Sequence, residues 1–361
     1  MTENSISFIV CSNGYGHIER VSRVINELLN LRTTLVLNLF AGTQQINFAK
    51  SQGYFRDFDN VSFDSSLSEF EVLWTDGGRF SKNNYFEWWK ELYSNEVLQK
   101  SHLIVSDNYV LPSRIFDNVL LMGSFLWHDS TISMNSDQKE IAKEEKRFLT
   151  RNKPSLLCLG DMVMEDTLYN QVKLEKLPWF AESVSTSNNG TNQNGILVTG
   201  GGTGIMTSFL MEIAVNLKNK KPELDIYLDK KIFESEESAR FRDLFRQFDF
   251  TADSFSNLKA VICRPGIGIL TDCVSHRIPI FAINDNFNKE INHNSNRIIE
   301  LEIGLSYKIK DYKVWEIVDS ILATINDDIE IQNFKNALNK RQMGGAKATA
   351  NFILRKLDGK Y

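Results

Sequence analysis

Cysteine is scarce in this 361-residue chain, and the four cysteines lie far apart, at positions 11, 158, 263 and 273. None belongs to a CxxC pair, no HExxH segment occurs, and the five histidines lack the spacing of metal ligands. Scattered cysteines inside apolar runs are typical of reduced, buried thiols and not of a disulfide framework. The sequence therefore predicts neither a disulfide scaffold nor a structural zinc site.

Long apolar runs and an excess of basic residues are also missing. No apolar stretch approaches the roughly 20 residues that cross a bilayer, and residues 1–17 lack the features of a signal peptide. The 41 Lys and Arg residues stand against 46 Asp and Glu residues, which gives a formal charge of −5 without a basic patch. Hydrophobic residues make up 42% and charged residues 24%, as in ordinary globular chains. These features predict a cytoplasmic protein without a nucleic-acid partner.

The first half of the chain has the pattern of alternating strands and helices. Residues 5–11 form a short apolar run, residues 12–17 read Ser-Asn-Gly-Tyr-Gly-His, and apolar residues then recur at three- and four-residue steps. A second apolar run follows at residues 34–40. This order of strand, glycine turn, helix and strand is a βαβ unit, and such units generate parallel sheets. Further buried strands are expected at residues 103–106, 119–122 and 155–159.

The same pattern begins again after a polar stretch. Residues 183–194 consist almost entirely of Ser, Thr, Asn, Gln and Gly, a composition typical of a linker. The elements expected beyond it are strands at 195–199, 224–228, 260–263 and 279–283, with glycine turns at 200–204 and 264–268. We therefore predict an α/β chain with Rossmann-like domains at 1–182 and 195–342, followed by a C-terminal helical segment at 343–361.

Three glycine turns lie between a predicted strand and a predicted helix. They span residues 13–17, 200–204 and 264–268, and the first contains Gly14 and Gly16. Glycine lets the backbone approach a ligand closely, and the helix start beyond it offers N–H groups and a partial positive charge that suit phosphate. A single such turn serves packing as readily as binding. Three of them, expected at the carboxyl ends of parallel strands in two domains, indicate a shared cleft.

The third turn carries the strongest ligand-binding signal. Arg264 stands beside helix-start amides at Gly266, an arrangement suited to a diphosphate. Asp272 follows within the helix and would either accept hydrogen bonds from ribose hydroxyls or form an exposed helix carboxylate. None of the turns reads GxGxxG or GxxxxGK(S/T), so the sequence indicates neither a nicotinamide cofactor nor an ATPase phosphate loop.

At these residues the chain resembles the GT-B glycosyltransferases, and in pattern most closely the group that contains the peptidoglycan N-acetylglucosaminyltransferase and the UDP-glycosyltransferases. The resemblance rests on Gly14-Tyr-Gly-His-Ile-Glu-Arg20, on Val198-Thr-Gly-Gly-Gly-Thr-Gly204 and on the stretch 264–304. It implies two Rossmann-like domains whose parallel sheets face each other across a cleft, with the acceptor on the first domain and a nucleotide-sugar donor on the second. It also implies that the helix at 346–357 returns to the first domain.

The resemblance further implies which residues hold the donor. The expected donor-binding residues are Gly14, Gly16, Gly201, Gly202, Thr203, Arg264, Gly266, Gly268, Asp272, Asp285, Asn292 and His293. Asp272 stands where the family usually has Glu, so a shorter side chain must reach the ribose. Asn292 and His293 stand where relatives often carry Gln or an Asp–Gln pair that holds sugar hydroxyls, and this departure leaves the donor sugar open. Asp285 is a further candidate for contact with the sugar.

His17 is the candidate catalytic base. Sugar transfer with inversion needs a base that works near pH 7, and the ordinary pKa of a histidine, about 6.5, suits this task. A helix start disfavours a cation, so the imidazole is expected to be neutral; the alternative is a histidine that caps or packs the turn. In many plant and animal relatives a carboxylate from a later strand orients the histidine, and Asp107 resembles that position. Otherwise Asp107 is a strand-terminal turn residue.

Other segments carry weaker signals. Asp57-Phe-Asp59 has the spelling of a metal-binding DxD motif but reads as a surface loop, and no metal is expected, because amides and Arg264 would stabilise the departing diphosphate. Trp127 and His128 would either line the acceptor side or pack a turn against the sheet. The aromatic residues of 80–93, which lie among lysines, are typical of a helix packed on a sheet, or of contact with a sugar acceptor or a membrane interface.

Together these features predict an inverting, metal-independent glycosyltransferase. It would move a sugar from a nucleotide-diphosphate donor, expected to be a UDP-sugar, to a hydroxyl of a glycan, a lipid-linked acceptor or a small molecule. The nucleotide sugar is a cosubstrate, and no further cofactor is expected. The expected location is the cytoplasm, with or without peripheral contact to the inner face of the membrane. The alternatives are a nucleotide-sugar hydrolase or epimerase on the same fold, and a catalytically silent nucleotide-sugar-binding protein.

Overall fold

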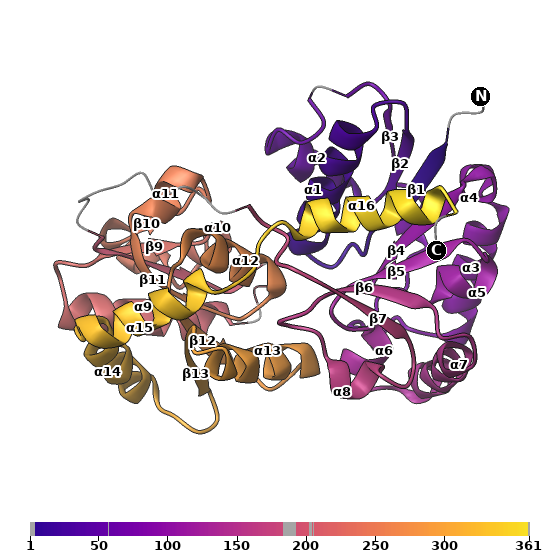
Figure 1. Ribbon diagram of the computed structural model, residues 1–361. Coiled ribbons are helices and arrows are strands. Elements are labelled where there is room, and N and C mark those ends of the chain that lie inside the picture. Colours follow the sequence, from indigo (N-terminus) through magenta and orange to yellow (C-terminus); the bar gives the residue numbers. More distant parts are fainter. Residues whose placement is uncertain (1–3, 57, 183–192, 202–203, 205, 360–361) are drawn as a thin grey trace. The chain divides into compact units, whose positions relative to one another are not determined.

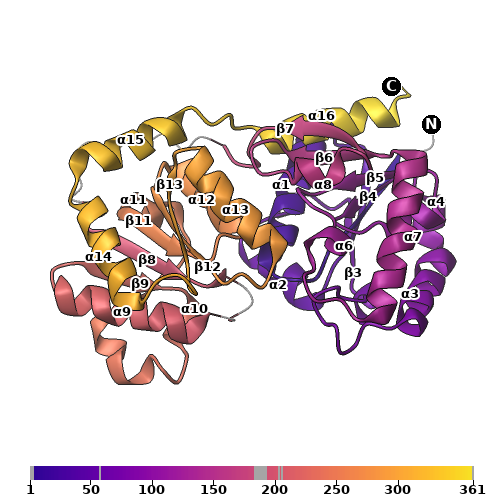
Figure 2. The same ribbon diagram turned by 90° about the horizontal axis from the view of Figure 1, so that it is seen from below.

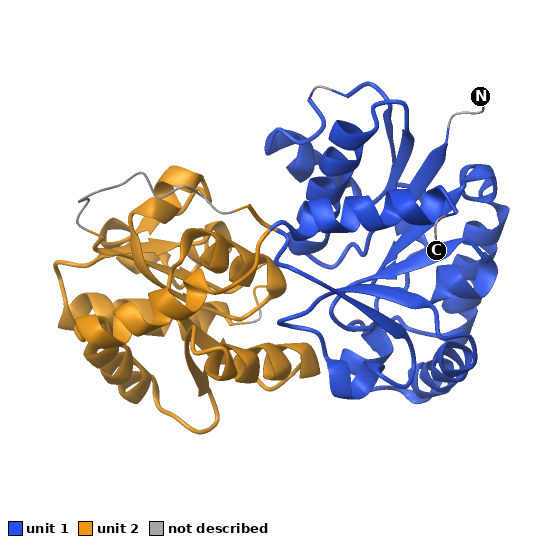
Figure 3. Cartoon of the chain, viewed as in Figure 1, with its two compact units in different colours: residues 1–180, 344–361 blue, residues 181–343 orange. Residues whose placement is uncertain are grey.

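The computed structural model of the chain describes residues 4–56, 58–182, 193–201, 204 and 206–359. The chain divides into two compact units, Met1–Phe180 with Gly344–Tyr361 and Ala181–Met343 (Figure 3). Residues 183–192 of the predicted linker lie outside the described residues.

Within the described residues, the first unit contains a seven-stranded sheet in the order β3-β2-β1-β4-β5-β6-β7 (Figure 1). Every neighbouring pair of its strands is parallel. The strands are β1 (Ser5–Ile9), β2 (Val36–Phe40), β3 (Val61–Asp64), β4 (Leu103–Asp107), β5 (Val119–Met122), β6 (Ser155–Leu159) and β7 (Lys173–Leu177). The helices are α1 (Tyr15–Leu31), α2 (Thr43–Ser51), η1 (Ser66–Glu69), α3 (Lys82–Ser94), α4 (Glu96–Lys100), α5 (Leu111–Ile115), α6 (Trp127–Ser130), α7 (Ser136–Asn152), α8 (Glu165–Leu168) and α16 (Gly345–Leu357).

The second unit contains a six-stranded sheet in the order β10-β9-β8-β11-β12-β13, again among the described residues and again parallel throughout. Its strands are β8 (Gly195–Thr199), β9 (Asp225–Leu228), β10 (Arg246–Gln247), β11 (Leu258–Cys263), β12 (Ile280–Asn284) and β13 (Gly304–Lys308). Its helices are α9 (Thr207–Lys220), α10 (Lys230–Phe233), η3 (Ala239–Leu244), α11 (Ala252–Ser256), α12 (Ile267–His276), α13 (Lys289–Glu300), α14 (Val314–Ile325) and α15 (Asp328–Asn339).

The strands predicted from apolar runs are confirmed because those runs are buried on both faces. Every residue of β4, β8 and β12 is buried, as expected for parallel strands covered by helices on either side. Helix α1 buries the residues that recur at three- and four-residue steps, from Ile18 to Leu29. The predicted α/β architecture with two parallel sheets is therefore confirmed.

The C-terminal helix α16 belongs to the first unit and packs on α1 (Figures 1 and 2). Its first residue, Gly345, donates its backbone N–H to the carbonyl of Trp179 at 2.7 Å. A Cβ atom at this position would lie 2.3 Å from the carbonyl oxygen of Pro178, so glycine allows this close approach. At the other end of α16, Arg32, which directly follows α1, donates two hydrogen bonds of 3.0 Å to the carboxylate of Asp358.

Both sheets have a point at which the strand order changes direction. In the first unit, β1 lies between β2 and β4, and in the second unit β8 lies between β9 and β11. Segments that leave the carboxyl ends of the two strands at such a point diverge to opposite faces of the sheet and leave room for a ligand. The predicted glycine turns follow β1, β8 and β11, and Asp107 ends β4. The turn that leads to His17, together with Asp107 and Arg264, therefore lies at the ends of strands at the switch points of the two sheets.

Candidate active site

His17 and Asp107 form a hydrogen-bonded pair at the switch point of the first unit. His17 lies in the first turn of α1, and its Nδ1 atom is 2.6 Å from Oδ2 of Asp107, the last residue of β4. The side chain of His17 is 14% exposed, whereas that of Asp107 is 1% exposed. The imidazole therefore keeps some access to solvent, whereas the carboxylate has almost none.

The charge of Asp107 determines which ring nitrogen of His17 carries the proton. Burial acts to raise the pKa of Asp107, but the positive charges of Arg20 and His17 and their hydrogen bonds outweigh it, so the pKa lies below its ordinary value. An ionised carboxylate can only accept hydrogen bonds. The Nδ1–H group of His17 therefore donates to Asp107, and the lone pair remains on Nε2, where a base needs it.

Arg20 and Asn108 hold this pair in place, and sequence reasoning missed both. Arg20, one helical turn after His17 on α1, donates to Oδ1 of Asp107 and, at 3.0 Å, to the side-chain oxygen of Asn108. Asn108 has a φ of 63° and donates its side-chain amide to the carbonyl of Phe125 at 2.7 Å. A Cβ atom at Gly123, whose φ is 142°, would lie 2.5 Å from this asparagine oxygen. The position of the Asn108 side chain thus requires a glycine at 123, and the sequence pattern does not connect the two residues.

The turn between β1 and α1 is fixed by its backbone. Gly14 directly precedes α1 and has a φ of 88°, a backbone angle that residues with a side chain rarely adopt. The side-chain amide of Gln45 donates to the carbonyls of Cys11 and Gly14 at 2.9 and 2.6 Å. Gly16 is exposed in the first turn of α1. The turn thus presents His17 from a rigid backbone, and a donor contact of Gly14 or Gly16 stays a prediction.

Trp127 lies beside the pair, but His128 does not. The ring centroids of His17 and Trp127 are 6.1 Å apart. His128 is buried, and its Nδ1 atom is 2.7 Å from a carboxylate oxygen of Glu145 while its Nε2 atom is 3.1 Å from the side-chain oxygen of Gln171. Both ring nitrogens of His128 therefore have partners inside the unit, and we leave this residue out of the proposed acceptor site.

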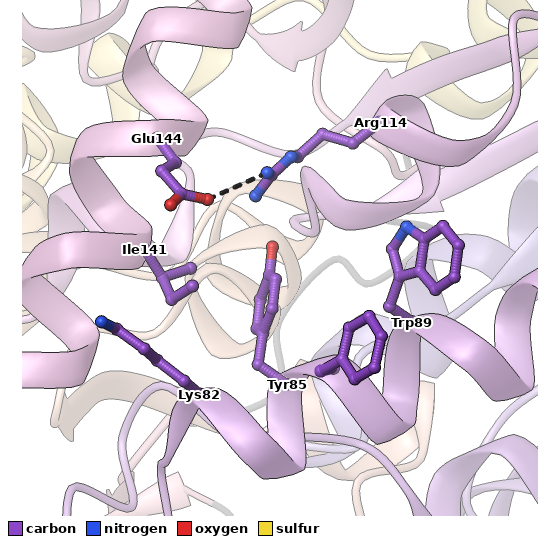
Figure 4. Close-up of a pocket in the computed structure, with 7 residues that line it drawn as sticks. Lys82, Tyr85, Trp89, Arg114, Ile141 and Glu144 are labelled. Atoms are coloured by element: carbon purple, nitrogen blue, oxygen red, sulfur yellow. Dashed lines mark hydrogen bonds and ion pairs between the residues drawn. The ribbon is translucent and has the colours of Figure 1, made fainter.

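The aromatic segment 80–93 forms α3, which has a buried and an exposed face. Tyr85 and Trp88 are buried, whereas Phe86 and Tyr93 are more than half exposed and stack on either side of Trp89. A pocket of about 330 Å³ opens between α3, α5 and α7, and its lining residues are Lys82, Tyr85, Phe86, Trp89, Arg114, Ile141 and Glu144 (Figure 4). Packing of α3 on the unit therefore accounts for one face, and contact of the other with a membrane or an acceptor stays a prediction.

In the second unit, the glycine turn after β8 is held by a buried carboxylate. Asp229 accepts hydrogen bonds of 2.8 Å from the hydroxyl of Thr199 and from the backbone N–H of Gly200. Gly201 follows with a φ of 70° and is exposed, and a Cβ atom there would meet nothing within 4 Å. The predicted nucleotide contacts Gly202 and Thr203 lie outside the described residues. Within this turn, Gly200 is therefore buried whereas Gly201 is exposed.

Arg264 and Asp285 form an ion pair at the switch point of the second unit. The Nε atom of Arg264 donates to Oδ2 of Asp285 at 2.7 Å, and Oδ1 of Asp285 accepts from the backbone N–H of Phe287 at 3.0 Å. Both oxygens of Asp285 are therefore occupied, and the residue orients the guanidinium. Helix α12 starts directly after Gly266, and among the described residues no side chain caps it. Gly268 contributes one of the first amides of α12. The guanidinium of Arg264, two residues before Gly266, has N–H groups besides the one at Nε.

The remaining predicted donor residues lie on α12 and α13. Asp272 is half-buried in α12, and Asn292 and His293 are half-buried on α13. Asn294, which the sequence analysis did not single out, donates its side-chain amide to the carbonyl of Pro265 at 2.9 Å. This hydrogen bond ties α13 to the turn that carries Arg264. Contacts of Asp272, Asn292 and His293 with a donor stay predictions.

Three further findings concern metals, membranes and thiols. Among the described residues, no group of three or more His, Cys, Asp and Glu side chains is placed to hold a metal ion, and Asp57 lies outside them. In the same part of the chain, no helix combines the length and the apolarity that crossing a membrane requires. All four cysteines are described, and they are free and buried.

Solved structures with a similar fold include glycosyltransferases. A structure of TcCGT1 in complex with UDP superimposes with a TM-score of 0.69 at 10% identity over all of both chains. Phytolacca americana UGT2, complexed with UDP-2fluoro-glucose and pterostilbene, gives 0.66 at 9% identity over 98% of this chain and 100% of that one. Medicago truncatula UGT71G1, complexed with UDP-glucose, gives 0.64 at 14% identity over 98% of both chains. The chain thus has the GT-B fold that the sequence predicted.

Comparison at the level of sequence gives no such match. No protein-family model matches the chain, and no curated protein matches it. The solved structures are only 9–14% identical to this chain, so their likeness establishes the fold alone. The chemistry has to be argued from the residues of this chain.

Proposed function

We propose that this chain is an inverting glycosyltransferase that moves a sugar from a nucleotide-diphosphate donor to a hydroxyl acceptor without a metal ion. The observation that carries the proposal is the His17–Asp107 pair, in which a buried carboxylate fixes the imidazole with its Nε2 lone pair available. The pair lies at the switch point of a parallel sheet, where α/β proteins bind their ligands. The GT-B fold supports the same assignment.

The proposed reaction takes place in one displacement. Nε2 of His17 accepts the proton of the acceptor hydroxyl while the acceptor oxygen attacks the anomeric carbon of the donor sugar. The bond between that carbon and the diphosphate oxygen breaks, its electron pair stays with the diphosphate, and the configuration at the anomeric carbon inverts. Asp107 stabilises the imidazolium that forms, in the manner of a catalytic triad. The products are the glycosylated acceptor, a nucleoside diphosphate and a proton.

The second unit is proposed to hold the donor. Arg264 would contact the diphosphate through the guanidinium N–H groups that Asp285 does not occupy, together with the first amides of α12. Because these donors are oriented before the reaction, they stabilise the negative charge that develops on the leaving group. We take the donor to be a UDP-sugar, since three similar structures were solved with UDP or a UDP-sugar. Closure of the two units would exclude water as a competing acceptor.

The test is a transfer assay on the purified full chain. Nucleoside diphosphates are first ranked by thermal shift, and the corresponding nucleotide sugars are then incubated with glycan, lipid-linked and small-molecule acceptors. We expect His17→Ala to lower transfer about a hundred- to ten-thousand-fold, the range for loss of a general base, and Arg264→Ala to weaken nucleotide binding.

Two matched variants control for nonspecific effects. His102→Ala removes a histidine at the opposite end of β4, where its ring nitrogen accepts from the backbone N–H of Ser5. Arg246→Ala removes an exposed arginine of the second unit that is paired with Asp225. Both should transfer sugar like the wild type. Full transfer by folded His17→Ala and Arg264→Ala would refute the proposal, and donor turnover without any acceptor would show a hydrolase or epimerase instead.

A further inference from the structure

A carboxylate that the proposed reaction does not use lies close to the His17–Asp107 pair. Glu71 belongs to the irregular segment between η1 and α3, and its neighbours Val72 and Trp74 are buried in the core of the first unit. Its Oε1 atom accepts a hydrogen bond of 3.0 Å from the backbone N–H of Ser12. The same oxygen accepts a hydrogen bond from the hydroxyl of Tyr109.

These two donors come from the two segments that carry the catalytic pair. Ser12 is in the turn between β1 and α1 and precedes His17 in that turn, and Tyr109 follows Asp107 directly after β4. Tyr109 is itself immobilised, because its ring packs edge-on against Trp88 at 4.8 Å between centroids and its carbonyl accepts from the hydroxyl of Ser106 at 2.8 Å. One oxygen of Glu71 therefore links the segment that bears the base to the segment that bears its carboxylate partner.

The surroundings of Glu71 contain few charges. The groups that face its carboxyl are the Cys11 thiol, the amide and hydroxyl of Ser12, the Tyr109 hydroxyl and the imidazole of His17. Burial raises the pKa of Glu71 to about 7, against the opposing effects of the Ser12 hydrogen bonds and of His17. Burial and the charge of Glu71 together raise the pKa of the Cys11 thiol well above its ordinary value, so the thiol stays neutral. Of the groups that face the carboxyl of Glu71, the imidazole of His17 is the one that can carry a positive charge.

We infer that Glu71 is a positioning residue for the proposed transferase, which ties the two halves of the His17–Asp107 pair together and favours the imidazolium form of His17 during proton transfer. This inference rests on the proposed function. An acceptor with two short links to opposite segments restricts their relative motion, and a carboxylate close to an imidazole stabilises the proton that arrives there.

Three substitutions separate the two contributions of Glu71. Glu71→Gln keeps an oxygen that can accept from Ser12 and Tyr109 but removes the charge. Tyr109→Phe keeps the charge and removes one link, and Glu71→Ala removes both. The matched control is Glu145→Gln. Glu145 is also a carboxylate between a tyrosine and a histidine, Tyr85 and His128, but it is buried and lies in a different part of the unit.

The first measurement is the pH dependence of transfer, once a donor and an acceptor are known. In the wild type, kcat/KM should fall more steeply at the acidic end than in Glu71→Gln, because protonation of Glu71 removes a charge that the variant lacks at every pH. At pH 8, kcat of Glu71→Gln should be about tenfold below that of the wild type, the low end of the effect of a neighbouring charge on a proton equilibrium. UDP affinity, measured by calorimetry, should not change. Unchanged kcat and slope in Glu71→Gln, or the same changes in Glu145→Gln, would overturn the inference.

The second measurement does not depend on activity. The Nδ1–H proton of His17 can be assigned by NMR from its absence in His17→Gln, and its exchange with solvent reports how tightly the pair is held. We expect exchange at least tenfold faster in Glu71→Ala, a smaller increase in Tyr109→Phe, and the wild-type rate in Glu145→Gln. Wild-type exchange in Glu71→Ala would refute the link. If the wild type transfers no sugar at all, the proposed function fails, and this measurement still decides whether Glu71 positions the pair.

Discussion

The buried network around His128 makes the stability of the first unit depend on pH. His128 has no accessible side-chain surface, and it lies between the carboxylates of Glu145, at 2.7 Å, and Asp129, at 3.2 Å. Burial acts to lower the pKa of His128, but the hydrogen bonds and charges of these two carboxylates outweigh it and raise the pKa to about 9. The folded unit therefore holds an imidazolium at neutral pH.

The size of the effect follows from the shift of that pKa. An increase from 6.5 to about 9 corresponds to about 3 kcal/mol, at about 1.4 kcal/mol per pKa unit. Because the folded pKa lies above the unfolded one, this contribution is fully present below pH 6.5 and is lost as the pH rises through 9. In a His128→Gln variant the contribution is absent at every pH. The difference in free energy of unfolding between wild type and His128→Gln should therefore fall by about 3 kcal/mol between pH 6 and pH 10.

Urea unfolding followed by tryptophan fluorescence measures this difference. Five of the six tryptophans lie before residue 181, so the signal reports mainly on the first unit. Titrations of wild type and His128→Gln at several pH values between 6 and 10 give the two free energies of unfolding, and their difference cancels the other titrating groups. A difference that stays constant across this range would refute the assignment of a charged, doubly paired His128.

Three further predictions concern other parts of the first unit. Asp107→Asn should lower kcat for transfer about a hundred- to ten-thousand-fold, because an amide no longer fixes the tautomer of His17; a wild-type kcat would contradict the proposed pair. Gly345→Ala should destabilise the unit by about 1–3 kcal/mol in urea unfolding, since its Cβ would lie 2.3 Å from the carbonyl oxygen of Pro178; an unchanged midpoint would show that α16 can shift at no cost. Above pH 7, the free energy of unfolding of Glu71→Gln should exceed that of the wild type by about 3 kcal/mol. Burial raises the pKa of Glu71 from 4.5 to about 7, so the wild type loses stability as the pH rises through that range. An equal free energy of unfolding at pH 8 would contradict that pKa.

Much of the fold could be predicted because its central strands are continuous apolar runs. Strands β1, β4, β8 and β11 are buried on both faces, so their sequences stand out from the polar segments around them. No strand was predicted at β3, β7, β10 or β13, which lie at the edges of the two sheets and have less apolar sequences. β7 is an edge strand with the sequence KLEKL, and β10 has two residues, both exposed. Such strands are recognised only through their pairing with a neighbour.

The contact between His17 and Asp107 could be predicted from the sequence, whereas the residues that support it could not. His17 follows a glycine turn and Asp107 ends a buried strand, and both signals are local in the sequence. Asn108 and Glu71 act through contacts with segments far away in the chain. The role of Asn108 depends on its positive φ and on the missing Cβ of Gly123, and that of Glu71 depends on a loop path without a periodic pattern. A sequence without aligned relatives contains no signal for such contacts.

Whether His17 accepts the proton of the acceptor can be decided in a single-turnover experiment. Wild type and His17→Gln are saturated with the nucleotide sugar, mixed with acceptor, and quenched at intervals, while calorimetry gives the UDP affinity of each. We expect the transfer rate of the variant to fall at least about a hundredfold with an unchanged UDP affinity. Equal transfer rates, or a loss explained entirely by weaker UDP binding, would contradict this role of His17.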